Sequence, residues 1–209
     1  MDFTLLLLVG AVPAVLVGQI YLLGRRMSQP EKIMHPTTGD LSELQQRTIS
    51  GYQEWLRSEG LEFCTSFKFG FIQVVVFQQG QLPRFFSFLF HKEVTFGTES
   101  YLEDLTILDT SNSATLGMFP RPGAYAQNFP KAPAQEVWRR HLDGEAHLSK
   151  KFGFNWVPIA KSYEELFMAA VRVRMKHNRS QLLWPFRVLY RYVVTRHSGA
   201  NRPIATQFP

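Results

Sequence analysis

The stretch Ile72–His91, IQVVVFQQGQLPRFFSFLFH, decides the fold class of this chain. It contains two apolar runs, Ile72–Phe77 and Arg84–His91, and the QQGQLP segment between them has the Gly and Pro residues that are typical of a turn. We therefore predict two strands that are joined directly, which makes the pair antiparallel. Because both runs are apolar on each face, the sheet needs cover on both sides, from helices, a partner or lipid.

Further strands are predicted on both sides of this hairpin. Upstream, the aromatic residues of Phe63–Phe71 alternate with Lys68 and Gly70. Downstream, strands are predicted at Glu93–Leu102 and Leu105–Thr110, with a possible closing strand at Ala114–Phe119. No helical pattern interrupts residues 61–119, so the sequence predicts an antiparallel meander.

A helix is predicted before these strands, over residues 40–59. Asp40 is a suitable N-cap, Glu43 stands at N3 as in a capping box, and Gly60 is a suitable residue for the position after the helix end. Apolar residues recur at spacings of three and four, which indicates one face turned toward a core.

Two more helices are predicted after the strands. Pro133 is suited to the first position of a helix over residues 134–150. Ser162 and Glu165 form a capping box for a helix that reaches about Lys176.

The remaining segments complete the domain organisation. Residues 120–133 hold four prolines and are expected to cross the surface from sheet to helix, and residues 181–195 have a helical and a strand pattern, of which we favour the helix. We predict one soluble α+β domain over residues 40–195, an antiparallel β-sheet flanked by helices, followed by a disordered tail at 196–209.

The N-terminal run Phe3–Gly24, FTLLLLVGAVPAVLVGQIYLLG, predicts a single transmembrane helix. It is uncharged and about 22 residues long, enough to cross a hydrocarbon core of about 30 Å. A cleaved signal peptide is the alternative, but the acidic Met1-Asp2 start and the sequence before Arg25 do not fit one. We expect residues 1–24 to be a retained anchor and residues 25–39 to be a juxtamembrane linker.

The flanking charges predict the orientation of this anchor. Arg25, Arg26 and Lys32 follow the run, whereas Asp2 precedes it, and basic residues near a span stay on the cytoplasmic side. The expected arrangement is N-terminus out and C-terminal domain cytoplasmic. The single cysteine, Cys64, agrees with a reducing compartment because one thiol cannot form an internal disulfide.

The net charge of +6 is concentrated at the C-terminal end, where residues 161–209 hold nine Lys or Arg and two acids. Arginines interleaved with aromatic residues can bind anionic lipid, an acidic protein or nucleic acid. The anchor brings this region to a membrane first, so nucleic acid is not the expected partner. A solvated basic face is the alternative. The candidate lipid- or anion-binding residues are Arg172, Arg174, Arg187, Arg191 and Arg196.

His141 and Glu145 are the candidate catalytic residues. They stand four positions apart, which puts an imidazole and a carboxylate on one helix face. His147 lies elsewhere around the helix, so two ligands are in register where a metal site needs three or four. The sequence has no phosphate-binding loop, nucleophile elbow or paired CxxC motif. We predict no metal and no cofactor, and favour a structural pair.

These features predict a single-pass membrane protein whose cytoplasmic α+β domain is a non-enzymatic binding or scaffold module, such as a subunit of a membrane complex. The alternative is a membrane-tethered enzyme or small-ligand domain that uses His141 and Glu145. A deep polar pocket at those two residues would favour the enzyme, whereas an exposed apolar face or aromatic groove would favour the scaffold.

Overall fold

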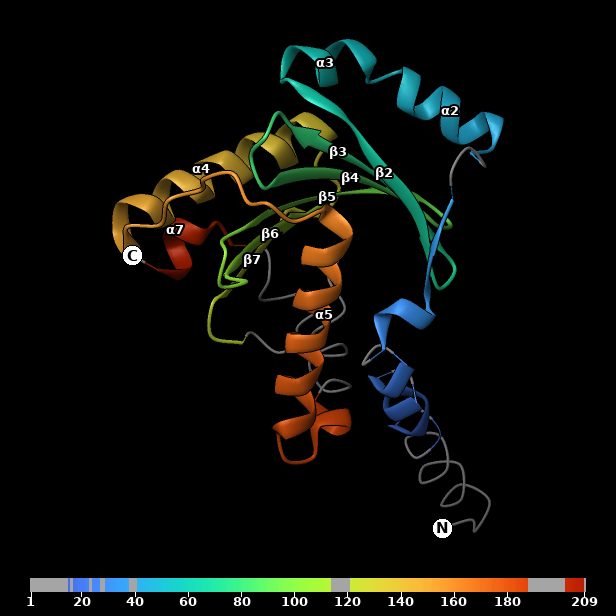
Figure 1. The fold of residues 1–209 in the computed structure, drawn as a ribbon, viewed down its shortest axis with the longest axis vertical. Coiled ribbons are helices and arrows are strands. Elements are labelled where there is room, and N and C mark those ends of the chain that lie inside the picture. The colour runs from blue at the N-terminus through green and yellow to red at the C-terminus, as the bar shows by residue number, and fades with distance from the viewer. Residues whose placement is uncertain are drawn as a thin grey trace, which may run out of the picture.

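The computed structural model describes residues 15, 17–22, 24–26, 29–37, 41–113, 121–187 and 202–208. A central sheet has helices on both faces (Figure 1). The elements, in chain order, are η1 (Pro30–Lys32), β1 (Met34–Pro36), α2 (Glu43–Ser50), α3 (Gln53–Ser58), β2 (Leu61–Phe69), β3 (Ile72–Gln79), β4 (Arg84–Phe90), β5 (Val94–Tyr101), β6 (Ile107–Ser111), β7 (Ala124–Asn128), α4 (Ala134–Phe152), α5 (Tyr163–Ser180) and α7 (Ile204–Gln207).

The sheet has seven strands whose spatial order is the order of the chain. Each pair from β1 to β6 is antiparallel, as the sequence predicts, but β7 pairs with β6 in parallel, with Ile107 opposite Ala124. The α+β class is therefore confirmed, whereas the purely antiparallel sheet is wrong. The prediction of a surface crossing at 120–133 missed β7, because the surrounding prolines conceal the short AYAQN strand. The strand expected at Ala114–Phe119 lies outside the described residues.

Both faces of the sheet are buried, which explains the strands that are apolar on each side. In β3, Val75 and Phe77 face a core that α3 and α4 cover, while Val74 and Val76 belong to the core under α5. Helices thus provide the expected cover. The first core is aromatic, and its largest buried members are Phe77, Phe86, Phe88, Phe90, Phe96 and Trp138.

The helix predicted over residues 40–59 is two helices, α2 and α3, separated at Gly51 and Tyr52. Its N-cap is Ser42, which forms a capping box with Gln45, and not Asp40, which lies outside the described residues. The start of α2 borders a pocket that residues of the sheet also line. Gly60 has the predicted role after the helix end, with φ of +67°.

The helices α4 and α5 correspond to the two later predictions. Pro133 is the N-cap of α4 and not its first helical residue. The capping box of Ser162 and Glu165 at the start of α5 is confirmed, and α5 continues past Lys176 to Ser180. Helix α4 packs on one face of the sheet and α5 on the other.

Within the tail for which the sequence predicts disorder, the structure describes residues 202–208, which include helix α7. Helix α7 packs against α4 and β7, and Ile204 is completely buried with Leu108 and Leu148. The Ile204 N–H also donates to Gln127 Oε1 at 3.0 Å. In the segment 181–195, residues 184–187 are helical and residues 188–195 lie outside the described part of the chain.

The predicted anchor, Phe3–Gly24, is described only at residues 15, 17–22 and 24, which are helical. None of the helices formed by described residues combines the length and the apolar composition that a membrane crossing requires. The C-terminal end of this N-terminal helix packs against the segment after α5, since the rings of Tyr21 and Trp184 have centroids 6.3 Å apart.

Candidate functional site

Helix α4 places His141 and Glu145 over strands β4 to β7. The close approach depends on Gly144, because a Cβ atom there would lie 2.8 Å from Gln127 Nε2. The glycine that weakens the helix as an isolated segment is thus required where α4 meets the sheet. The side chains of His141 and Glu145 are 0% and 4% exposed.

A chain of hydrogen bonds fixes the tautomer of His141. Gln127 Nε2 donates to Thr110 Oγ1 at 2.9 Å, which leaves the Thr110 hydroxyl to donate to His141 Nδ1, also at 2.9 Å. On the other side of the ring, Ser100 Oγ donates to Glu145 Oε1 and accepts from His141 Nε2–H at 2.7 Å. The network is complete with a neutral imidazole protonated at Nε2.

Arg84 of β4 provides the counter-charge for Glu145. Its Nε donates to Glu145 Oε1 at 2.9 Å and its Nη2 donates to Oε2, so the pair is bidentate. A third donor, Nη1, reaches Gln79 Oε1. Burial alone would raise the pKa of Glu145, but its interactions with the nearby His141, with Arg84 and with Ser100 outweigh the effect of burial and lower the pKa to about 2.

The environment of His141 does not suit acid–base catalysis. Burial lowers its pKa, and the interaction with Glu145 only partly opposes this effect. Both ring nitrogens are occupied by protein partners, and the ring does not reach solvent. The arrangement is that of a satisfied polar network inside the core.

The sequence predicts the His141–Glu145 pair but not its partners, which come from four different strands. Arg84 and Ser100 are direct cross-strand neighbours, as are Thr110 and Gln127. One signal in the sequence could have indicated these partners. Alternate positions of β5 hold the polar residues Thr98 and Ser100, on a face of the sheet that is otherwise aromatic.

The opposite face of the same strands carries a second pair of ionisable side chains, both half-buried. Glu99 and Asp109 lie directly across from each other on β5 and β6. The hydroxyls of Tyr101 and Tyr163 donate to Glu99 Oε2 at 2.7 and 3.1 Å. Burial raises the pKa of Glu99, and burial together with the Glu99 charge raises the pKa of Asp109 to about 7, against the lowering effect of Arg174.

The structure separates the basic residues proposed to bind lipid or anions. The half-buried Arg174 acts electrostatically on this carboxylate pair, and the exposed Arg172 pairs with Glu31 of η1 at 3.0 Å. Arg187 is exposed after α5 and donates to Gln181 Oε1 at 3.3 Å. Arg191 and Arg196 lie outside the described residues. Lipid binding by these residues stays a prediction.

The segment that follows α5 exposes apolar side chains. Leu182, Leu183 and Phe186 are 83%, 61% and 53% exposed, whereas Trp184 between them is buried. Trp184 packs on Gly24, where an added Cβ atom would lie 2.3 Å from its ring. Leu183 has φ of +56°, a left-handed conformation that costs a residue with a Cβ atom about 1–2 kcal/mol.

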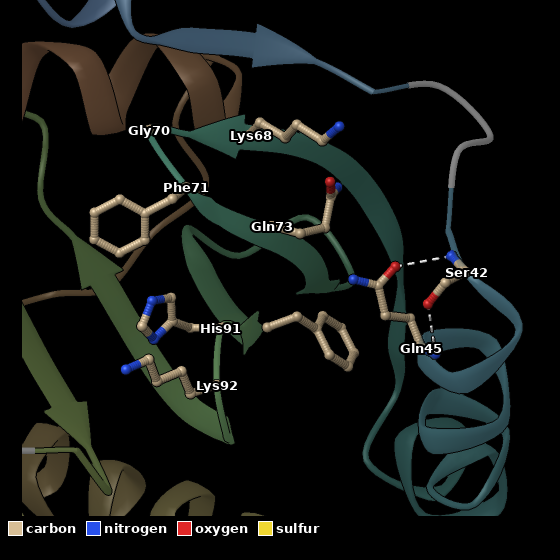
Figure 2. Close-up of a pocket in the computed structure, with 9 residues that line it drawn as sticks. Ser42, Gln45, Lys68, Gly70, Phe71, Gln73, His91 and Lys92 are labelled. Atoms are coloured by element: carbon tan, nitrogen blue, oxygen red, sulfur yellow. Dashed lines mark hydrogen bonds between the residues drawn. The ribbon is translucent and has the colours of Figure 1, made fainter.

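A pocket of about 640 Å³ lies where the β2–β3 turn, the β4–β5 turn and the start of α2 meet (Figure 2). Its size is within the usual range for small-molecule sites. The sequence does not indicate it, because its residues come together only through strand register. They are Ser42, Gln45, Lys68, Gly70, Phe71, Gln73, Phe90, His91 and Lys92.

Metal chemistry has no support in the described residues, where no three His, Cys, Asp or Glu side chains are grouped to hold an ion. Comparison of the chain with protein-family models, curated proteins and solved structures finds no match.

Proposed function

We propose that this chain is a membrane-anchored, non-enzymatic binding module. The run Phe3–Gly24 crosses the bilayer, and the segment after α5 rests on the cytoplasmic surface of the same membrane. The observation that carries the proposal is the exposed apolar group Leu182, Leu183 and Phe186, next to the helix at the C-terminal end of the apolar run.

The exposed side chains after α5 suit a bilayer interface. A single exposed leucine needs no explanation, but a group of large apolar side chains on a short segment favours contact with a partner or lipid. The left-handed backbone at Leu183 supports this interpretation, since Gly or Asn would fit there without the strain that a leucine carries.

The position of this group relative to the N-terminal helix favours lipid as the occupant. Trp184, after α5, packs on Tyr21 and Gly24 at the end of the apolar run, and Arg172 of α5 pairs with Glu31 in the segment that follows the run. Figure 1 shows the C-terminal end of α5 and the N-terminal helix extending away from the sheet in the same direction. A bilayer that contains the run would therefore meet the end of α5.

The interior of the domain favours binding over catalysis. The His141–Glu145 pair, on which the enzyme hypothesis rests, is enclosed between α4 and the sheet and has all its hydrogen bonds made by protein groups. A substrate would have to displace α4 to reach it. The open pocket between α2 and the hairpin turns is a better candidate for contact with a ligand.

A reporter fused after Pro209 tests both the anchor and its orientation. The full chain is expected in the membrane fraction, with a reporter that functions in the cytoplasm active and one that requires export inactive. The reason is the position of Arg25 and Arg26 after the run.

A charge-exchange variant is the matched control for this fusion. Moving the positive charge in front of the run, with Asp2→Arg, Arg25→Gln and Arg26→Gln, should increase the exported fraction. Recovery of the unmodified chain in the soluble fraction, or a mature N-terminus near residue 25, would contradict the proposed anchor.

A further inference from the structure

A row of residues from four neighbouring strands leads into the pocket of Figure 2. His35 lies opposite Lys68, Lys68 opposite Gln73, and Gln73 opposite Phe90. Direct cross-strand neighbours share a face, so the row runs across the face that α4 covers farther along the sheet. Here that cover is missing, and the polar Gln73 takes the place that Val75 and Phe77 have within the core.

The lining of the pocket is basic. Lys68 of β2 and the adjacent His91 and Lys92 of the β4–β5 turn contribute their side chains, and no Asp or Glu is among the lining residues. Lys68 and Lys92 are exposed and make no ion pair with any described residue. These two unpaired charges stand on opposite sides of the pocket and make it attractive to an anion (Figure 2).

The remaining walls offer hydrogen bonds and an aromatic face. The start of α2 borders the pocket with Ser42 and Gln45, and the positive end of the helix dipole adds to the basic field. Gln73 forms the buried floor and is held by a hydrogen bond from its Nε2 to Thr37 Oγ1 at 2.6 Å. Phe71 is 78% exposed, and its ring lies 4.8 Å from that of His91.

We infer that this pocket binds the phosphate group of an organic phosphate monoester. Lys68 and Lys92 supply point charges, the usual partners of phosphate oxygens, and the Phe71 ring provides a surface for the carbon part of the ligand. The site uses none of the arginines in the C-terminal basic region, so it goes beyond the membrane-contact proposal.

The ligand has two possible sources with the same chemistry. The β2–β3 turn is joined to the juxtamembrane segment, since the Gly70 N–H donates to Ile33 O at 3.2 Å. A phosphate monoester headgroup, such as that of phosphatidic acid, is therefore as suitable a ligand as a free organic phosphate.

Calorimetric titration of the full chain in a nonionic detergent with phenyl phosphate tests the inference. The unmodified chain is expected to bind, and the double variant Lys68→Gln and Lys92→Gln should bind at least tenfold more weakly. The control with Lys131→Gln and Lys161→Gln removes the same charge from exposed positions elsewhere and should bind as the unmodified chain does. Phe71→Ala should weaken phenyl phosphate binding more than inorganic phosphate binding.

A second arm uses bicelles that contain phosphatidic acid or only phosphatidylcholine. A preference for phosphatidic acid that the pocket variant loses and the control keeps identifies a lipid headgroup, whereas binding of phenyl phosphate without that preference identifies a free ligand. The inference would be overturned if the pocket variant bound phenyl phosphate and phosphatidic acid bicelles as tightly as the control variant does. It would also be overturned if the unmodified chain bound neither of them. The reporter assay of the anchor is independent of this outcome.

Discussion

Replacing Glu145 by alanine is expected to lower the free energy of unfolding by about 3–5 kcal/mol, the usual effect of removing one partner of a buried ion pair. The loss arises because Arg84 would keep its charge in a site where its side chain is only 16% exposed, and because Ser100 would lose its acceptor. Urea denaturation at neutral pH, monitored by tryptophan fluorescence, provides the measurement.

Two further variants separate the buried charge from a general effect of losing a carboxylate. Glu103→Ala removes an exposed carboxylate and should change the free energy of unfolding by less than about 0.5 kcal/mol. The double variant Arg84→Met and Glu145→Leu removes both charges and should be clearly more stable than Glu145→Ala alone. If Glu145→Ala cost less than about 1 kcal/mol, the structural interpretation of the network would be wrong.

Replacing Asp109 by asparagine is expected to stabilise the protein at alkaline pH. The folded-state pKa of Asp109 is about 7, well above the usual value for an aspartate, so the folded protein binds a proton between about pH 4 and pH 7 that the unfolded chain does not bind. The contribution of this group to stability therefore decreases as the pH rises through 7. Asp109→Asn removes that loss and should raise the free energy of unfolding at pH 8 by about 2–4 kcal/mol.

The difference between variant and unmodified protein isolates this effect from other titrations. His141, with its lowered pKa, acts in the opposite direction, because the unfolded chain gains a proton below about pH 6.5 before the folded protein does. Its contribution cancels when the two chains are compared at each pH. Glu103→Gln, which removes a carboxylate from an exposed site, is the matched control. A constant loss of stability in Asp109→Asn from pH 5 to pH 8 would contradict the assigned pKa.

Local patterns in the sequence predicted the parts of the fold that depend on neighbouring residues. The apolar runs on either side of QQGQLP predicted β3 and β4, and the Ser162–Glu165 spacing predicted the start of α5. The parallel pairing of β7 was not predictable in the same way, because it depends on contacts with β6 across a 12-residue connection that includes two prolines. The order of the C-terminal end likewise depends on a distant residue, Gln127, which accepts from the Ile204 N–H.

The candidate sites were likewise predictable only where their residues are close together in the sequence. The helical spacing of His141 and Glu145 placed both residues on one face, as the structure confirms, but their burial depends on Gly144 and on four strands. The basic pocket combines Lys68 with residues of a later turn, and only the register of β2, β3 and β4 brings them together. The sequence therefore indicated the contact between His141 and Glu145, but not the contacts that either group of residues makes across strands.

The central claim, that the segment after α5 contacts the bilayer, is tested most directly by lipid quenching of a fluorophore at residue 183. In the Cys64→Ser background, which removes the one native thiol, the full chain with Leu183→Cys is labelled with bimane and reconstituted into vesicles with or without brominated lipids. The same label at Asp143→Cys, an exposed position on α4, is the matched control. The account predicts strong quenching at residue 183 and little at residue 143. Equal quenching at the two positions, or none at residue 183, would contradict it.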